Sequence, residues 1–157
     1  IRDSNEPGVL ARIAGLFSGR GYNIESLTVS ETEHEKHVSR ITIVTTGTAM
    51  VIEQIKHQLD RLVPVHRVVD LTAQGDAVER ELALVKVVGK GDSRSEALRI
   101  AAAFGARTLD ATLDSFVFEL TGASEEIERF IRVMAGLGLS EVSRTGIAAM
   151  SRGVDAL

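Results

Sequence analysis

SNEPGVLARIAGLFSGRGYNIESLTVSE, residues 4–31, contains a helix pattern followed directly by a strand pattern. Apolar residues recur at helical spacing after Pro7, so we expect an amphipathic helix with Pro7 in its first turn and Gly19 or Gly21 at its end. The predicted apolar stripe consists of Val9, Leu10, Ile13, Leu16 and Phe17. Residues 23–30 then alternate between apolar and polar types, which predicts a half-buried strand.

The remainder of the first half completes a unit around this helix and strand. The polar run ETEHEKH, residues 31–37, predicts a hairpin loop, and the β-branched residues of 38–46 predict the strand that follows it. Thr48 is a suitable N-cap for a second helix, after which residues 65–72 are expected to form a strand. Because residues 1–4 offer little of an apolar strand, the predicted order is a largely missing strand, helix, strand, strand, helix, strand.

The same order of elements starts again after the turn-rich segment AQGDA, residues 73–77. In this second half we expect strands over 80–90, 106–113, 115–121 and 139–147, and helices capped by Asp92 or Ser93 and by Ser124. The repeated order predicts an α+β protein built from two ferredoxin-like βαββαβ sandwiches, with domains at 1–75 and 78–157. Each sandwich leaves one sheet face or edge open, which favours a homodimer.

The composition excludes several classes of function. The chain of 157 residues contains no cysteine, which rules out disulfides, thiolate zinc sites and cysteine nucleophiles. It has a net charge of −4, no basic half and no aromatic residues interleaved with Lys or Arg, so we expect no nucleic-acid partner. No apolar run approaches the roughly 18 to 20 residues of a membrane span, so we expect no membrane partner and a cytoplasmic protein.

Two glycine-rich stretches invite comparison with nucleotide-binding loops, and both fail. In VVGKGDS, residues 87–93, the pattern of a phosphate loop fails because Gly91 follows the lysine where Ser or Thr is needed. In GLFSGRG, residues 15–21, the glycines end a helix rather than begin one, unlike those of a dinucleotide-binding fingerprint. Both stretches are therefore interpreted as ordinary turns.

No set of residues argues for catalysis or for a resident metal. His34 and His37 lie among glutamates, but on a predicted hairpin loop nothing would hold ligand geometry. Glu125 and Glu126 are expected in the first turn of a helix, where carboxylates complement its dipole. A binding or regulatory module is favoured, and an enzyme or metal-dependent sensor that uses the two histidines is the rival hypothesis.

The start of the first predicted helix offers a physical basis for ligand binding. The backbone N–H groups of residues 8–10 lack intrahelical partners and carry the positive end of the helix dipole, so a small carboxylate fits there. Asn5 before this helix and Asn23 after it add amide groups that suit a zwitterion, and Pro7 restricts the loop. If a second subunit completes this site, ligand binding reports on the geometry of the dimer.

Five segments, in order and over nearly the whole chain, resemble the family of small regulatory subunits of acetolactate synthase, also called acetohydroxyacid synthase. The segments are NEPGVLARIAGLFSGRGYNIESLTV (5–29), SRITIV (39–44), QLDRLVPVHRV (58–68), VERELALVKV (78–87) and RTGIAAMSRG (144–153). The resemblance implies an N-terminal ACT domain, the βαββαβ module that senses amino acids, over residues 1–75. It also implies a second, ACT-like domain in the remainder of the chain.

The resemblance also implies a function. Members of this family dimerise through their ACT domains and bind valine at that interface. They raise the activity of a separate large catalytic subunit and make it sensitive to valine. That catalytic subunit carries thiamine diphosphate, magnesium and FAD, so no cofactor is expected on this chain. It condenses pyruvate with pyruvate or 2-oxobutyrate in branched-chain amino-acid biosynthesis, here in a bacterial cytoplasm.

The resemblance further implies which residues bind the effector. Carried over by position, they are Asn5, Pro7, Gly8, Val9, Leu10, Asn23, Ile24 and Ser30. No residue is expected to be catalytic or to bind a metal. The alternative within the same fold is a general amino-acid-binding ACT regulator with a different target.

Overall fold

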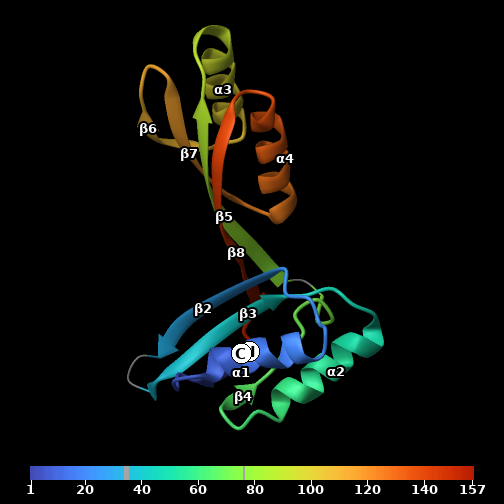
Figure 1. The fold of residues 1–157 in the computed structure, drawn as a ribbon. Helices are drawn as coiled ribbons and strands as arrows, with labels where there is room; N and C mark the ends of the chain where they lie inside the picture. The colour runs from blue at the N-terminus through green and yellow to red at the C-terminus, as the bar shows by residue number, and fades with distance from the viewer. Residues whose placement is uncertain (34–35, 76) are drawn as a thin grey trace. The chain divides into compact units, whose positions relative to one another are not determined.

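The computed structural model describes residues 1–33, 36–75 and 77–157, and these form two compact units (Figure 1). The first unit comprises Ile1–Val78 together with Ile147–Leu157, and the second comprises Glu79–Gly146. The sequence analysis assigned all residues after 78 to the second domain, whereas the last eleven pack with the first unit. Each unit is described by itself below.

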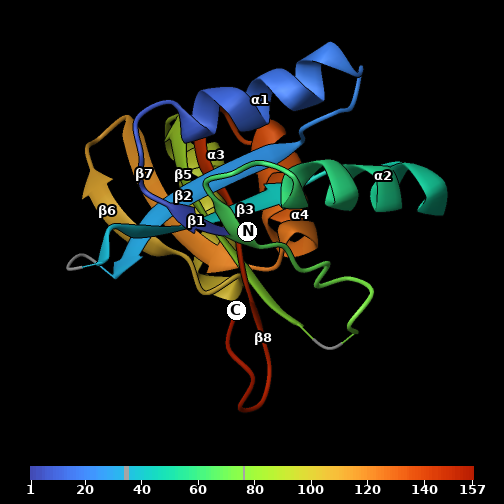
Figure 2. The same cartoon turned by 90° about the horizontal axis from the view of Figure 1, so that it is seen from below.

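The first unit is a four-stranded antiparallel sheet with two helices on one face (Figure 2). Its elements are β1 (Arg2–Ser4), α1 (Val9–Gly19), β2 (Ser26–Glu33), β3 (Val38–Val44), α2 (Ala49–Asp60) and β4 (Val65–Arg67). The strands lie in the order β2-β3-β1-β4, so β2 and β4 are the edges and β1 is central. This confirms the predicted βαββαβ arrangement.

The core of this unit lies between the sheet and the two helices. Its buried residues are Val9, Ile13, Phe17, Ile41, Ile55 and Leu59. Three of them come from the stripe predicted for the first helix, which is confirmed at those positions. Leu10 is the exception, because its side chain is 44% exposed.

The first strand, expected to be largely missing, is present as three residues. β1 pairs with β3 on one side and with β4 on the other. Main-chain groups make these ladder bonds, so the strand forms although its side chains are mostly polar. One consequence is unusual: Asp3 is only 2% exposed, opposite the equally buried Ser39.

Three predicted boundaries in the first unit were wrong. β2 begins at Ser26 rather than at residue 23 and continues to Glu33, so it includes residues that were assigned to the hairpin loop. As an edge strand with one solvated face, β2 accepts these polar residues. β4 contains three residues rather than the eight of 65–72. His34, part of the rival metal hypothesis, lies outside the described residues.

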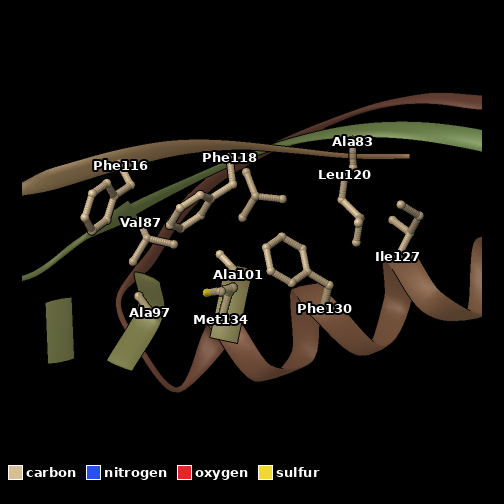
Figure 3. Packing of buried hydrophobic residues seen from close by; sticks show 11 residues of the cluster. Ala83, Val87, Ala97, Ala101, Phe116, Phe118, Leu120, Ile127, Phe130 and Met134 are labelled. Atoms are coloured by element: carbon tan, nitrogen blue, oxygen red, sulfur yellow. The ribbon is translucent and has the colours of Figure 1, made fainter. Parts of the chain in front are cut away.

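The second unit repeats the architecture of the first. Its elements are β5 (Ala77–Val88), α3 (Gly91–Ala103), β6 (Arg107–Ala111), β7 (Ser115–Gly122), α4 (Ser124–Ala135) and β8 (Leu139–Ser151). The strand order β6-β7-β5-β8 matches that of the first sheet, strand for strand. Figure 3 shows the core, where Phe118 packs edge-on against Phe130 at a centroid distance of 6.3 Å.

Helix starts in the second unit differ from the prediction. α3 begins at Gly91 with Lys90 as its N-cap, and the hydroxyl of Ser93 donates instead to the carbonyl of Leu137. α4 begins at Ser124, so Ser124 is its first residue and not its cap. The tertiary structure offers both hydroxyls other acceptors, which compete with capping. By contrast, Thr48 caps α2 as predicted, accepting from the amide of Val51 at 3.3 Å.

Candidate functional site

The N-terminus of α1 has the features expected of a carboxylate site. Gly8 is the N-cap, with a left-handed conformation (φ 88°) and no side-chain cap. The first turn of α1 contains no acidic residue, so no carboxylate of that turn offsets the dipole. The amide of Val9 donates to Glu6 O at 3.3 Å, which leaves the N–H groups of Gly8 and Leu10 as the better candidates for a ligand.

Space and exposure around this turn suit a small ligand. A Cβ added to Gly8 would meet nothing within 4 Å, so the glycine is needed for its backbone conformation and not for clearance. Pro7 and Leu10 are exposed, whereas the side chain of Val9 is buried in the core. Of the predicted set, Val9 can therefore contribute only backbone atoms.

Asn5 is tied to a polar cluster that the sequence analysis did not predict. Its amide nitrogen lies 3.4 Å from Glu31 Oε1, and its backbone N–H donates to His37 O at 2.6 Å. The His37 ring lies 4.0 Å from the same Glu31 oxygen. Glu31 and His37 were both assigned to a solvated loop, and only the pairing of β2 with β3 brings them to Asn5.

Asn23 and Ile24 lie at the other end of α1. The amide of Tyr22 donates to Phe17 O at 2.9 Å, which holds the following residues near the helix C-terminus. The carbonyl of Asn23 accepts from Thr45 Oγ1 at 2.5 Å, and Ile24 packs against the core. A helix of 11 residues is about 16 Å long, far longer than a free amino acid. Within one chain, these two residues cannot reach a ligand bound at Gly8.

Ser30 occupies a third location. It pairs with Arg40, one residue along the strand from the core residue Ile41, so its side chain lies on the sheet face away from the helices. The predicted set of eight residues is thus divided among the start of α1, the end of α1 and the far face of β2.

Among the described residues, one histidine contacts a serine. His66 Nε2 lies 2.8 Å from Ser4 Oγ, a contact between β1 and β4 at an exposed position. A serine and a histidine alone do not make a hydrolase, which also needs a group that orients the imidazole and an oxyanion site. In the part of the chain that the structure describes, no group of three or more His, Asp or Glu residues is arranged to hold a metal ion.

A buried ion pair is the main charged feature of the second unit. Glu81 is 4% exposed and binds Arg144 through two hydrogen bonds, at 2.6 and 3.0 Å. The hydroxyl of Ser124 donates to the same carboxylate at 2.7 Å, and Arg144 also contacts Glu128. The hydrogen bond from Arg144 lowers the pKa of Glu81 below its ordinary value. Both carboxylate oxygens of Glu81 are hydrogen-bonded within the fold, so we assign the cluster to stability.

Within the described residues, no helix has the length and hydropathy needed to cross a membrane.

The other two motifs singled out in the second half of the sequence form a turn and a helix start, as predicted. Gly89 lies in the turn before α3, and its amide donates to Asp114 O at 2.8 Å. Glu125 and Glu126 occupy the first turn of α4.

Both units match known family models. Residues 1–67 match the ACT domain described as like that of the acetohydroxyacid synthase small subunit, and residues 80–153 match the small subunit of acetolactate synthase. The two matches follow each other along the chain as the two units do.

Relatives and one solved structure agree with these matches. A probable acetolactate synthase small subunit of Archaeoglobus fulgidus is 45% identical, over 95% of this chain and 92% of the relative. The acetolactate synthase small subunit of Aquifex aeolicus is 46% identical, over 97% of this chain and 79% of the relative. The crystal structure of the Thermotoga maritima small subunit superposes with a TM-score of 0.86 at 36% identity, covering 98% of this chain and 95% of that one.

Proposed function

We propose a regulatory function for this chain, which belongs to the acetolactate synthase small-subunit family. Its role is regulatory rather than catalytic, and its partner is the large catalytic subunit of acetolactate synthase. In this proposal the chain raises the activity of that partner and makes it sensitive to inhibition by valine. Thiamine diphosphate, magnesium and FAD belong to the partner, which performs the condensation of two pyruvate molecules.

The observation that carries the effector proposal is the separation of the predicted residues. Asn5 and Gly8 lie at the start of α1, whereas Asn23 and Ile24 lie at its end. A single small ligand can touch both groups only if they come from two subunits. Asn23 and Ile24 immediately precede β2, an edge strand of the sheet, and an edge strand is available to a second copy of the chain. The site is therefore proposed to form in a homodimer of ACT domains.

The chemistry of each half suits one part of valine. The carboxylate is proposed to accept hydrogen bonds from N–H groups at Gly8 and Leu10, where the helix dipole favours an anion. Glu31, which lies beside Asn5, is placed to attract the ammonium group. Leu10, and Ile24 of the partner subunit, are proposed to supply apolar surface for the branched side chain. Ser30 faces away from α1 and stays the weakest member of the set.

Regulation follows if valine prefers one geometry of the dimer over another. An effector that bridges two subunits changes how they pair, and a coupling free energy of about 1–3 kcal/mol suffices for ordinary feedback. Each half of the site precedes or follows a strand of the sheet, so a change in how the two subunits associate is passed directly to the sheet.

The first experiment compares Gly8→Asp with Gly8→Asn. Both residues tolerate a left-handed backbone better than other side chains do, and they are nearly equal in size. Only Asp places a negative charge where the valine carboxylate is proposed to bind. We expect calorimetry to show binding lost in Gly8→Asp and weakened less in Gly8→Asn. If the two variants bind valine equally well, the site lies elsewhere.

The second experiment tests the partner. Purified chain is mixed with the acetolactate synthase large subunit of the same organism, and acetolactate formation is measured with and without valine. We expect no activity from the chain alone, higher activity from the mixture than from the large subunit alone, and inhibition by valine. Activity of the isolated chain would support the enzyme hypothesis. Valine binding without any effect on the large subunit would support an ACT regulator of another target.

A further inference from the structure

The last eleven residues, Ile147–Leu157, belong to the first unit and contact its sheet near both ends of the segment, and we call them the strap. Thr28 Oγ1 donates to Ile147 O at 3.2 Å, and the Arg40 guanidinium donates to Ala149 O at 2.7 Å. Thr28 and Arg40 point away from the core, because they alternate along their strands with the core residues Leu27 and Ile41. The strap therefore contacts the face opposite the helices.

The strap contacts this sheet at both of its edges. Three of the hydrogen bonds that it accepts come from Thr28 on β2, Arg40 on β3 and Arg67 on β4, and Arg67 donates to Ala156 O at 3.0 Å. Since the strand order is β2-β3-β1-β4, these donors follow the order of the sheet. One continuous segment of chain is thus attached to both edge strands.

The face beneath the strap carries a row of arginines. Arg2 on the central strand is directly opposite Arg40 on one side and Arg67 on the other. Like charges directly opposite each other destabilise a sheet unless other groups offset the repulsion. Carbonyl oxygens of the strap accept hydrogen bonds from Arg40 and Arg67, which gives this arrangement a structural purpose.

The strap is the continuation of β8. Residues 139–146 of this strand belong to the second unit, and the strap begins at Ile147. Gly146, the last residue before the strap, has a φ of 85°, a conformation that glycine adopts without strain. The strap therefore begins inside β8, which continues as a strand to Ser151, and Ile147 is already bonded to Thr28 of the first sheet.

We propose that the strap transmits effector binding from the first unit to β8, through the bonds that Thr28, Arg40 and Arg67 make to its carbonyl groups. This inference rests on the proposed valine site. Asn23 and Ile24 lead directly into β2, which carries Thr28. On the other side, Asn5 follows β1, the strand that pairs with those carrying Arg40 and Arg67. Both halves of the site are thus adjacent to strands that hold the strap, and β8 extends into the second sheet.

The test uses full-length Arg40→Met together with the large subunit. Methionine keeps much of the apolar length of arginine but removes its donors. Three quantities are measured: the valine dissociation constant of the chain, the activation of the large subunit without valine, and the ratio of activities without and with saturating valine. Coupling factors of about 5- to 150-fold are usual in allosteric proteins. We expect that ratio to fall to within about 2-fold of unity, while valine affinity and activation change by less than about 2-fold.

Matched variants separate the strap bond from loss of charge. Arg40→Lys keeps a cationic donor and should retain most of the coupling. Arg61→Met removes a charge at the C-cap of α2, on the helix side, and should leave all three quantities unchanged. Thr28→Val and Arg67→Met should weaken coupling less than Arg40→Met. The effect of Arg67→Met should be the smallest of the three because the hydrogen bond that it removes is exposed.

Hydrogen exchange supplies a direct readout. In Arg40→Met, amides of residues 147–151 should exchange faster, whereas amides of α1 and α2 should not. Coupling that stays at its wild-type level in Arg40→Met would overturn the strap proposal and leave the proposed function standing. If the wild-type chain itself neither binds valine nor alters the large subunit, the proposed function fails, and the regulatory role of the strap fails with it.

Discussion

The two units have the same strand order, but their central strands bury a carboxylate in opposite ways. In the first unit, Asp3 on the three-residue β1 is 2% exposed, and its Oδ1 atom has no hydrogen-bond partner. In the second unit, Glu81 on the twelve-residue β5 is 4% exposed and is bound by Arg144 and Ser124. One fold therefore leaves an oxygen of a buried carboxyl group without a partner in one copy and binds both carboxylate oxygens in the other.

This difference indicates how each unit is stabilised. β5 places Ala83, Val85 and Val87 in the core, and its ion pair adds stability without a ligand. β1 contributes little apolar surface, and the first unit adds the strap, which contacts its open face. We therefore expect the first unit to be the less stable of the two, which would suit the effector-binding function proposed above.

The largest expected effect comes from Arg144→Met in the second unit. It leaves Glu81 buried without its cation, so we expect destabilisation by about 3 kcal/mol at neutral pH. The pKa of Glu81 is lowered in the folded protein, so the stabilisation is present above the ordinary value of 4.5 and is lost as pH falls. Hydrogen exchange of β5 amides at pH 7 and in acid checks both points. An equal destabilisation at both pH values would contradict the role of the Glu81–Arg144 ion pair in stability. Arg144→Lys keeps a cation and should destabilise the unit less than Arg144→Met does.

The next effect has the opposite sign. Asp3→Val removes an unsatisfied buried oxygen from the first unit, so we expect stabilisation by about 1–3 kcal/mol at neutral pH. Burial raises the pKa of Asp3 above its ordinary value of 3.8. Its folded state is therefore favoured below that value, and this advantage is lost as pH rises through the folded pKa. The increase in stability produced by Asp3→Val should therefore grow with pH.

Two observations check this prediction in the full-length chain. The stability of the first unit is measured from the hydrogen-exchange rates of β3 amides, since β3 lies in that unit. Asp3→Asn keeps a polar side chain but cannot ionise, so its stability should not change with pH through this group. If Asp3→Val destabilised the first unit, the carboxyl group of Asp3 would have a hydrogen-bond partner in solution.

A smaller effect is expected at the helix caps. Thr48→Ala removes the bond to the amide of Val51, which should destabilise α2 by about 1 kcal/mol. Thr48→Ser keeps a hydroxyl and should restore most of the loss. Faster hydrogen exchange confined to α2 is the expected signature, and unchanged exchange would mean that water caps this helix equally well.

The smallest effect is expected for the exposed ion pair Lys86–Glu141, at 2.9 Å. Its side chains are 44% and 66% exposed, so Lys86→Met should change stability by less than about 1 kcal/mol. This variant is the counterpart of Arg144→Met in the same unit. If both variants destabilised the second unit equally, burial would not be the reason for the strength of the Glu81 pair.

Much of the fold was predictable because it depends on local patterns. The spacing of Ile13 and Phe17 requires a helix with one buried face, and the repeated order of elements requires two similar sheets. Thr48 stands at the N-cap and accepts from Val51, whereas Ser93 and Ser124 lie inside their helices and donate to acceptors that only the folded chain supplies. Residue type indicates a cap near these positions, but the exact helix start depends on tertiary contacts.

Local sequence patterns were enough to predict the two sandwiches, the open start of α1 and the resemblance to a family, since helical periodicity, turn residues and motif order are properties of neighbouring residues. The folded chain was needed to show that Asn23 lies at the far end of α1 from Gly8, that Glu31 joins Asn5, and that the last residues return to the first sheet. These are relations between residues far apart in the chain, and they depend on strand pairing and packing, which no local pattern specifies.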